Sequence, residues 1–251
     1  MSSAVTLRRL DLAQLRTVCS ACSLRELCLP LGLDTDEIAH LDMLIERRRP
    51  LRRGEYLFRA GSPFQSLYAV RTGFLKSYAL HEDGREQVTG FHMMGEIVGL
   101  DAISSDAHTC DAIALEDTEI CEIPFARLEE LSRHMPTLQR HLHKIMSREI
   151  VRDHGVMLLL GSMKAEERLA AFLLNLSQRY AARGYSPISF HLRMTREEIG
   201  SYLGLKLETV SRAFSRFQEE KLVTVHNKDV ELKDIDALKM MIGQHTNCAR
   251  H

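Results

Sequence analysis

The chain has 251 residues, 45% hydrophobic and 27% charged, a composition typical of a folded soluble protein with room for two modest domains. Its formal net charge of -1 gives no overall attraction for nucleic acid, so any basic surface must be local. No run approaches the roughly 18 apolar residues of a membrane span, and no secretory signal is readable. A cytoplasmic location is therefore expected.

The cysteines are distributed unevenly. Three lie within ten residues and three are scattered: Cys19, Cys22 and Cys28, then Cys110, Cys121 and Cys248. Because cytosolic thiols stay reduced, a disulfide framework is not expected. By spacing alone, the C-x2-C-x5-C run could hold zinc, an iron-sulfur cluster or nothing.

Glycines separate short β-prone segments between Pro50 and Pro124. The segments begin at Gly54, Ser66, Gly73, Gln87 and Glu119. Many short strands joined by glycine turns predict an antiparallel sandwich, barrel or roll.

Helical spacing begins after Pro124. It predicts a short helix from Phe125, a long helix near Pro136–Leu160 and another over Lys164–Ala182.

Five residues of the long helix step by 4, 3, 4 and 3: Met146, Ile150, Asp153, Met157 and Leu160. This is the a/d spacing of a seam between two helices and predicts a homodimer, the alternative being an amphipathic helix packed on its own roll. Two Asp153 carboxylates facing each other across a two-fold axis would repel. Such a seam should be marginal, and a marginal seam can be switched.

The segment from Met194 to Leu232 predicts a winged helix-turn-helix. Thr195 to Glu198 forms a capping box, and Gly204 supplies the turn after the first helix. A second helix near Leu207–Glu219 would bury three residues at i, i+4 and i+7: Val210, Phe214 and Phe217. A hairpin with its turn at His226–Asp229 follows as the wing.

The exposed face of this second helix is suited to the major groove. Arg212 can bond guanine, Glu208 can accept from cytosine, and Ser211 can bond several bases. The alternative is an ordinary solvated face. Between Arg193 and Lys228 there are seven positive and five negative side chains, so nonspecific affinity should be modest.

A roll, a long helix and a C-terminal winged helix in that order resemble the Crp/Fnr superfamily of bacterial transcription regulators. The N-terminal cysteine run through Cys28-Leu-Pro30, and Cys121-Glu-Ile-Pro124 further on, resemble the fumarate and nitrate reduction regulator (FNR) branch. In that branch three clustered cysteines and one remote cysteine bind a 4Fe-4S cluster. The resemblance therefore implies four metal ligands: Cys19, Cys22, Cys28 and Cys121.

The recognition helix carries the second match. Glu208-Thr-Val-Ser211-Arg212 is similar to the E-x-x-S-R signature of the FNR branch, so Glu208, Thr209, Ser211 and Arg212 are the candidate DNA-binding residues. The cyclic-AMP-binding branch has an arginine immediately before the glutamate, where this chain has Leu207.

The resemblance implies an oxygen-responsive activator or repressor. Without oxygen the 4Fe-4S protein would dimerise and bind a TTGAT-N4-ATCAA-like palindrome, and oxygen would convert the cluster to 2Fe-2S and dissociate the dimer. The alternative keeps the DNA-binding module and uses the cysteines as a zinc or thiol-redox switch. RNA polymerase would contact the hairpin at His81–Glu86 and the loop near Thr72, which could also be ordinary exposed turns.

Other side chains are assigned lesser roles or none. Ser23 and Leu27 lie between ligands and are expected to limit access to the cluster. Cyclic nucleotide is not expected, because Gly95-Glu96 is not followed by the Arg-Ser of a phosphate cassette and Asp111 would repel a phosphate. No catalytic motif is present, so the chain is not expected to be an enzyme.

The expected fold class is α+β, divided into an N-terminal cysteine-rich cluster-binding segment, a β-roll like that of cyclic-nucleotide-binding domains, a long dimerisation helix, a winged helix-turn-helix domain and a C-terminal tail. The cysteine-rich segment is expected over 1–29, the β-roll over 30–134 and the dimerisation helix over 135–160. The winged helix-turn-helix domain follows over 161–234 and the tail over 235–251.

Overall fold

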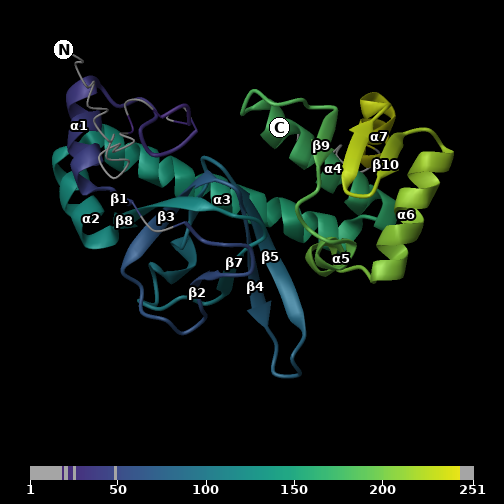
Figure 1. The fold of residues 1–251 in the computed structure, drawn as a ribbon, viewed down its shortest axis with the longest axis horizontal. Coiled ribbons are helices and arrows are strands. Elements are labelled where there is room, and N and C mark those ends of the chain that lie inside the picture. The colour runs from purple at the N-terminus through teal and green to yellow at the C-terminus, as the bar shows by residue number, and fades with distance from the viewer. Residues whose placement is uncertain (1–18, 20–21, 25–26, 48–49, 244–251) are drawn as a thin grey trace, which may run out of the picture.

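The computed structural model describes residues 19, 22–24, 27–47 and 50–243. Within these residues two four-stranded antiparallel sheets form the predicted roll, with strand orders β1-β8-β3-β6 and β2-β7-β4-β5 (Figure 1). The strands are β1 (Glu46–Arg47), β2 (Tyr56–Phe58), β3 (Ser66–Thr72), β4 (Phe74–Leu80), β5 (Glu86–Met93), β6 (Ile97–Val98), β7 (Asp111–Ala114) and β8 (Glu119–Pro124). The expected antiparallel roll is confirmed.

The turn between β3 and β4 requires glycine. Gly73 has a φ of 88°, and a Cβ at this position would lie 2.4 Å from the Thr118 hydroxyl oxygen. Only a residue without a side chain fits there. This turn takes the chain from β3 in one sheet to β4 in the other.

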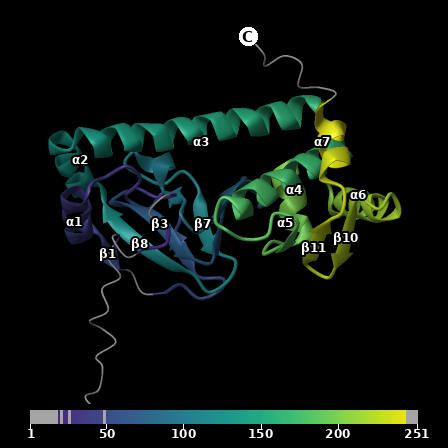
Figure 2. The same ribbon diagram turned by 90° about the horizontal axis from the view of Figure 1, so that it is seen from above.

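Among the described residues before β9, three helices accompany the roll and a fourth packs in the C-terminal domain. They are α1 (Thr35–Leu44), α2 (Phe125–His134), α3 (Pro136–Ser162) and α4 (Ala165–Ala181). The three helices predicted after Pro124 are confirmed, whereas α1, which a capping box between Asp34 and Glu37 opens, was not predicted. Figure 2 shows α3 extending along the roll toward the C-terminal domain. None of the described helices is long and apolar enough to cross a membrane.

The C-terminal domain has the predicted winged helix-turn-helix. Its elements are β9 (Ser189–His191), α5 (Arg196–Leu203), α6 (Leu207–Glu219), β10 (Val223–His226), β11 (Asp229–Leu232) and α7 (Ile235–Gly243). The capping box is present, with the Glu198 backbone N–H donating to the Thr195 hydroxyl at 3.1 Å. Val210, Phe214 and Phe217 are buried, as their spacing predicted.

Two features of this domain differ from the sequence interpretation. Strand β9 adds to the wing, giving the order β10-β11-β9. The interpretation of residues 235–251 as a tail was wrong for 235–243, because α7 buries Leu238 completely and packs with α4. The Asp234 carboxylate accepts from the Ala237 N–H at 2.8 Å and so starts α7, a cap that was not recognised in the sequence.

Candidate functional site

Four cysteine side chains line one cavity beside the roll. Cys19, Cys22 and Cys28 come from the N-terminal segment, and Cys121 comes from β8. The remaining lining is mostly apolar: Leu24, Leu29, Pro30, Ile45, Ala69, Val70, Arg71, Gly95 and Ile123. The structure thus brings together the three clustered cysteines and the remote one, and it places Cys110 elsewhere.

Local hydrogen bonds set the positions of these thiols. The Cys22 N–H donates to the Cys19 carbonyl at 3.1 Å, and the Cys28 N–H donates to the Leu24 carbonyl at 3.0 Å, which folds the segment into tight turns. Cys121 lies on β8 between two partners, opposite Ala69 of β3 on one side and β1 on the other. One side of the cavity is therefore a rigid sheet and the other a turn-rich loop.

Burial shifts the thiols of Cys28 and Cys19 toward their protonated form. The pKa of Cys28 is raised to about 12, by burial first and then by the neighbouring thiols of Cys121 and Cys22, although a hydrogen bond from the Leu29 backbone acts in the opposite direction. Burial also raises the pKa of Cys19, and the negative charge of Asp42 is the second cause of that rise. The Asp42 carboxylate accepts a hydrogen bond from the Cys19 backbone N–H. Because a metal binds the thiolate, loading this site would release protons, and the bound metal would supply the charge compensation that the apolar walls do not.

The two residues expected to limit access to the cluster differ in position. Leu27 is half-buried, and its Cβ lies 3.0 Å from where a Cβ on Gly95 would be, so it covers one edge of the cavity. Ser23 is exposed. Neither lines the cavity directly.

Cys110 belongs to a second cavity of about 500 Å³ between the roll and α3. Its sulfur lies 3.6 Å from an Asp101 carboxylate oxygen, and its pKa is raised to about 12 by burial first and by Asp101 second. The carboxylates of Asp101, Glu149 and Asp153 all line this cavity. Cys248 lies outside the described residues.

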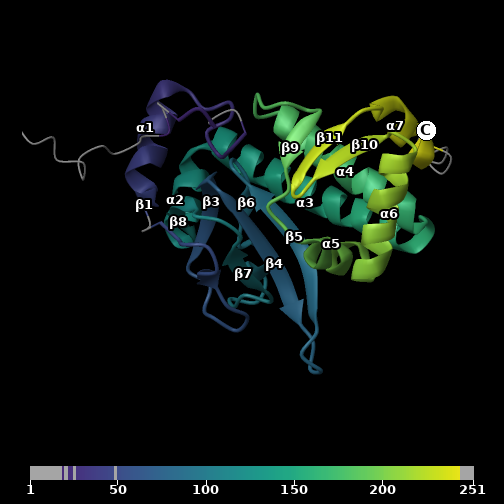
Figure 3. The same ribbon diagram turned by 45° about the vertical axis from the view of Figure 1, so that its right-hand side comes forward.

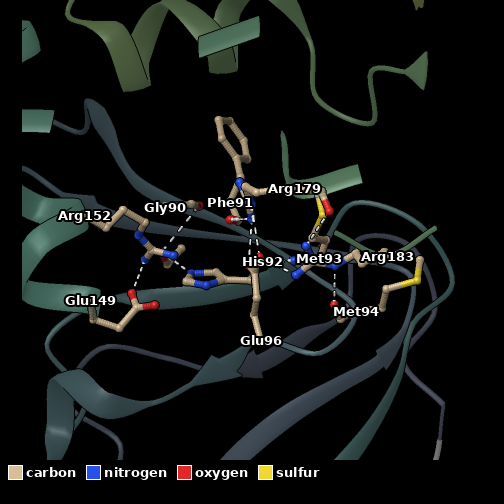
Figure 4. A network of polar contacts seen from close by, with 11 residues as sticks. Gly90, Phe91, His92, Met93, Met94, Glu96, Glu149, Arg152, Arg179 and Arg183 are labelled. Carbon is tan, nitrogen blue, oxygen red and sulfur yellow. Dashed lines mark hydrogen bonds and ion pairs between the residues drawn. The ribbon is translucent and has the colours of Figure 1, made fainter. Parts of the chain in front are cut away.

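The wall of the second cavity includes a buried histidine. His92 is 6% exposed, its Nε2 lies 2.9 Å from the Ser77 hydroxyl, and its Nδ1 has no hydrogen-bond partner. Burial lowers the pKa of His92 to about 3, so the ring is neutral. Figure 4 shows it between the Glu149–Arg152 pair and the residues around Glu96.

Glu96 binds the C-terminal domain. Its carboxylate pairs with Arg179 of α4 at 2.6 Å and with Arg183, two residues after the end of α4, at 2.7 Å (Figure 4). The same two arginines also donate to the Phe91 and Met94 carbonyls. The absence of a cyclic nucleotide stays a prediction, and this engagement of the cassette glutamate supports it.

Helix α5 packs on strand β5 at the edge of the roll (Figure 3). The Ser201 hydroxyl accepts from the Val88 N–H and donates to the Glu86 carbonyl, both at 2.8 Å. Lys76, which is buried, pairs with Glu86 at 3.0 Å and with Glu198 at 3.1 Å. The sensor roll and the first helix of the helix-turn-helix are therefore directly connected.

The recognition helix α6 presents the predicted face. Glu208 and Arg212 are exposed, and Thr209 and Ser211 are half-buried. The turn before α6 is tight, since a Cβ on Gly200 would lie 2.6 Å from the Leu205 carbonyl oxygen. The arrangement leaves Glu208 and Arg212 accessible to solvent while the opposite face of α6 fills the core.

The predicted seam on α3 divides into two groups. Ile150 is 56% exposed, Met157 is 60% exposed and Asp153 is exposed as well. Met146 and Leu160, at the two ends, are half-buried against cores of the same chain. The middle of the seam is thus available to a second chain, as are the neighbouring side chains of Val151 and Leu158, which the spacing did not select.

Two residues that the sequence analysis did not predict as functional connect α3 to other parts of the chain, one to α5 and one to the cysteine loop. Arg168 of α4 donates to the Leu160 carbonyl at 2.8 Å and to the Leu203 carbonyl at 2.9 Å, joining the ends of α3 and α5. His141 of α3 lies 3.1 Å from the Cys28 carbonyl oxygen. No local motif marks either residue, because both contacts join segments far apart in the sequence.

A β-roll, a long helix with an exposed apolar stripe and a winged helix-turn-helix define a DNA-binding transcription regulator. Residues 48–134 match the family model described as "Cyclic nucleotide-binding domain", and residues 167–241 match "Crp-like helix-turn-helix domain". The chain belongs to the Crp/Fnr family, whose members regulate transcription, bind DNA as dimers and are not enzymes.

Named relatives cover nearly the whole chain. The transcriptional activator protein Anr of Pseudomonas protegens is 50% identical over 243 residues, which are 97% of this chain and 98% of that protein. The fumarate and nitrate reduction regulatory protein of Escherichia coli K12 is 46% identical over 97% of each chain. The structure of FixK2 from Bradyrhizobium japonicum is 32% identical, with a TM-score of 0.72 over 78% of this chain and 97% of that chain.

Proposed function

We propose that this protein is an oxygen-responsive transcription regulator that carries a 4Fe-4S cluster on Cys19, Cys22, Cys28 and Cys121. One observation carries the proposal, namely that these four thiols, up to 102 positions apart in the sequence, line a single apolar cavity. Similarity to proteins named Anr and fumarate and nitrate reduction regulatory protein supports the same assignment. When bound, the cluster supplies a centre that oxygen can oxidise and break down.

The donor set fits a cluster better than a single ion. A tetrahedral zinc site with bonds of about 2.3 Å would hold its sulfurs about 3.8 Å apart. Among the described residues, no three His, Cys, Asp or Glu side chains are grouped closely enough to hold one metal ion. A cubane distributes its ligands over four iron atoms, so it suits four thiols that surround a cavity without meeting at a point. This favours the cluster over the zinc alternative.

The chain's own residues would keep the cluster accessible only in part. The apolar walls exclude water, and Leu27 over Gly95 narrows one edge of the cavity. Asp42 adds negative charge beside Cys19. Both features would set how readily oxygen reaches and reacts with the site.

The output of the sensor would be dimerisation and sequence-specific DNA binding inside the cell. Glu208, Ser211 and Arg212 would read a TTGAT-N4-ATCAA-like palindrome, with one half-site for each protomer. All six residues of the turn between β4 and β5, His81–Glu86, are exposed, and the turn would be available to RNA polymerase.

Serine substitution at each cysteine tests the ligand assignment. After anaerobic reconstitution with iron and sulfide, Cys121→Ser and Cys28→Ser should lose the visible chromophore of the wild-type protein. Cys110→Ser is the matched control, since Cys110 lines the other cavity, and it should keep the chromophore. A Cys121→Ser protein with the full wild-type spectrum would refute the proposed ligand set.

A further inference from the structure

His141 lies where the cysteine loop meets the dimerisation helix. It is in the second turn of α3 and is 5% exposed. Its Nε2 is 3.1 Å from the Cys28 carbonyl oxygen. A carbonyl oxygen can only accept, so Nε2 carries the proton and donates it into this bond.

The bond joins two segments that share one hydrophobic core. Cys19, Cys28 and Cys121 pack against this core from the cysteine side, and α3 contributes Leu138, Leu142 and Ile145. Met146 of the predicted seam packs against the same core, and Ile150 follows it one turn later. The Cys28 backbone is therefore in direct contact with the helix that carries the seam.

The bond is not required to satisfy the Cys28 backbone. The Cys28 carbonyl also accepts from the Leu31 N–H at 3.2 Å, so it keeps a partner when His141 is replaced. Removing the histidine would leave no buried carbonyl unpaired and should cost little in folding. The hydrogen bond adds a link between loop and helix rather than completing the loop itself.

We propose that His141 is the positioning residue that couples cluster loading at Cys28 to dimerisation of α3. This inference rests on the proposed function. The cluster fixes the Cys28 backbone, His141 holds α3 against it, and the exposed seam residues Ile150, Asp153 and Met157 take the orientation that pairs with a second chain. Coupling between two sites is a free energy, so it is measured by how much one event changes the other.

The experiment compares His141→Leu, His141→Gln and wild type as full chains, with His143→Leu as the matched control, since His143 is exposed two residues away on the same helix. Iron and acid-labile sulfide per chain are measured first. The monomer–dimer dissociation constant is then measured anaerobically by analytical ultracentrifugation for the cluster-loaded and the cluster-free form of each variant.

In wild type and His143→Leu, cluster loading should tighten the dimer. In His141→Leu that tightening should fall by about tenfold or more at unchanged iron and sulfide content. His141→Gln should retain most of the coupling because its amide can donate to the same carbonyl. If His141→Leu does not fold, as judged by circular dichroism, His141→Met takes its place in the comparison.

Two results would overturn the inference about His141 and leave the proposed function standing. One is wild-type tightening in fully loaded His141→Leu. The other is failure of folded His141→Leu to hold the cluster, which would show that His141 supports the cysteine loop from α3 and is needed for binding rather than for coupling. If the wild-type protein itself holds no iron and sulfide, the proposed function and this inference both fail.

Discussion

Changing Glu96 to Gln removes the charge that holds Arg179 of α4 and Arg183 just after it on the roll. The Glu96 carboxylate contacts Arg179 at 2.6 Å and Arg183 at 2.7 Å. The side chain of Arg183 is 5% exposed and that of Glu96 17% exposed, so water cannot replace the lost charge well. The substitution keeps the shape of the side chain, and the effect is therefore electrostatic.

Two independent arguments give the same magnitude for the loss of folding stability. Removing one partner of a buried ion pair costs about 3 to 5 kcal/mol, because the remaining charge stays buried without compensation. Independently, Arg179 and then Arg183 overcome the effect of burial and lower the pKa of Glu96 to about 2, from an ordinary value of 4.5. That difference corresponds to about 3 kcal/mol of stability.

The pH dependence has a definite sign. Because the pKa of Glu96 is lower in the folded than in the unfolded chain, its contribution is fully present above about pH 4.5 and is lost as the pH falls toward about 2. Glu96→Gln should therefore be less stable than wild type at pH 7, and the difference between the two should shrink in acid.

Thermal unfolding at one fixed protein concentration measures the effect. For a chain of this size, a loss of about 3 kcal/mol should lower Tm by roughly 6 to 12 °C. Glu116→Gln is the control, since its partner Arg193 is 41% exposed and such a pair contributes at most about 1 kcal/mol. Equal shifts in the two variants would refute the claim that Glu96 fastens the DNA-binding domain to the roll.

The remaining predictions concern DNA binding and dimerisation. Arg212→Ala should lose about 1 to 3 kcal/mol of discrimination between the palindrome and a mismatched site in fluorescence anisotropy titrations. Arg216→Ala is the control: the Arg216 guanidinium pairs with Glu220, and losing its charge should weaken binding to the two DNA sites equally. Unchanged discrimination in Arg212→Ala would exclude it from base reading. Asp153→Ala and Asp153→Asn should both stay dimeric in air during size-exclusion chromatography with light scattering, since the repulsive charge is gone. A wild-type response to air would show that dimerisation is governed elsewhere.

The sequence predicted the elements that local chemistry determines. The capping box at Thr195, the turn at Gly204 and the apolar spacing of Val210, Phe214 and Phe217 each act within a few residues, and the structure has all of them. The long helix was equally clear, because nothing in its interior breaks the helical spacing. Strands β1 and β6, of two residues each, gave no periodicity to read.

The site depended on contacts that no spacing encodes. Cys121 reaches the N-terminal cysteines only because β8 lies in the middle of its sheet, and the sequence suggested this through resemblance rather than geometry. Gly95-Glu96 was recognised only as the beginning of an incomplete phosphate cassette, and the ion-pair partners of Glu96 are 83 and 87 residues away. His141 belongs to no motif, and its contact with Cys28 spans 113 residues.

The central claim is tested most directly by measuring iron and acid-labile sulfide per chain on anaerobically purified protein. The visible spectrum is then followed as air is admitted. The account predicts about four iron and four sulfide per chain, with absorbance that bleaches or shifts in air. Zinc, or no metal and no sulfide, would contradict it and would leave a DNA-binding regulator of the Crp/Fnr family that responds to a different signal.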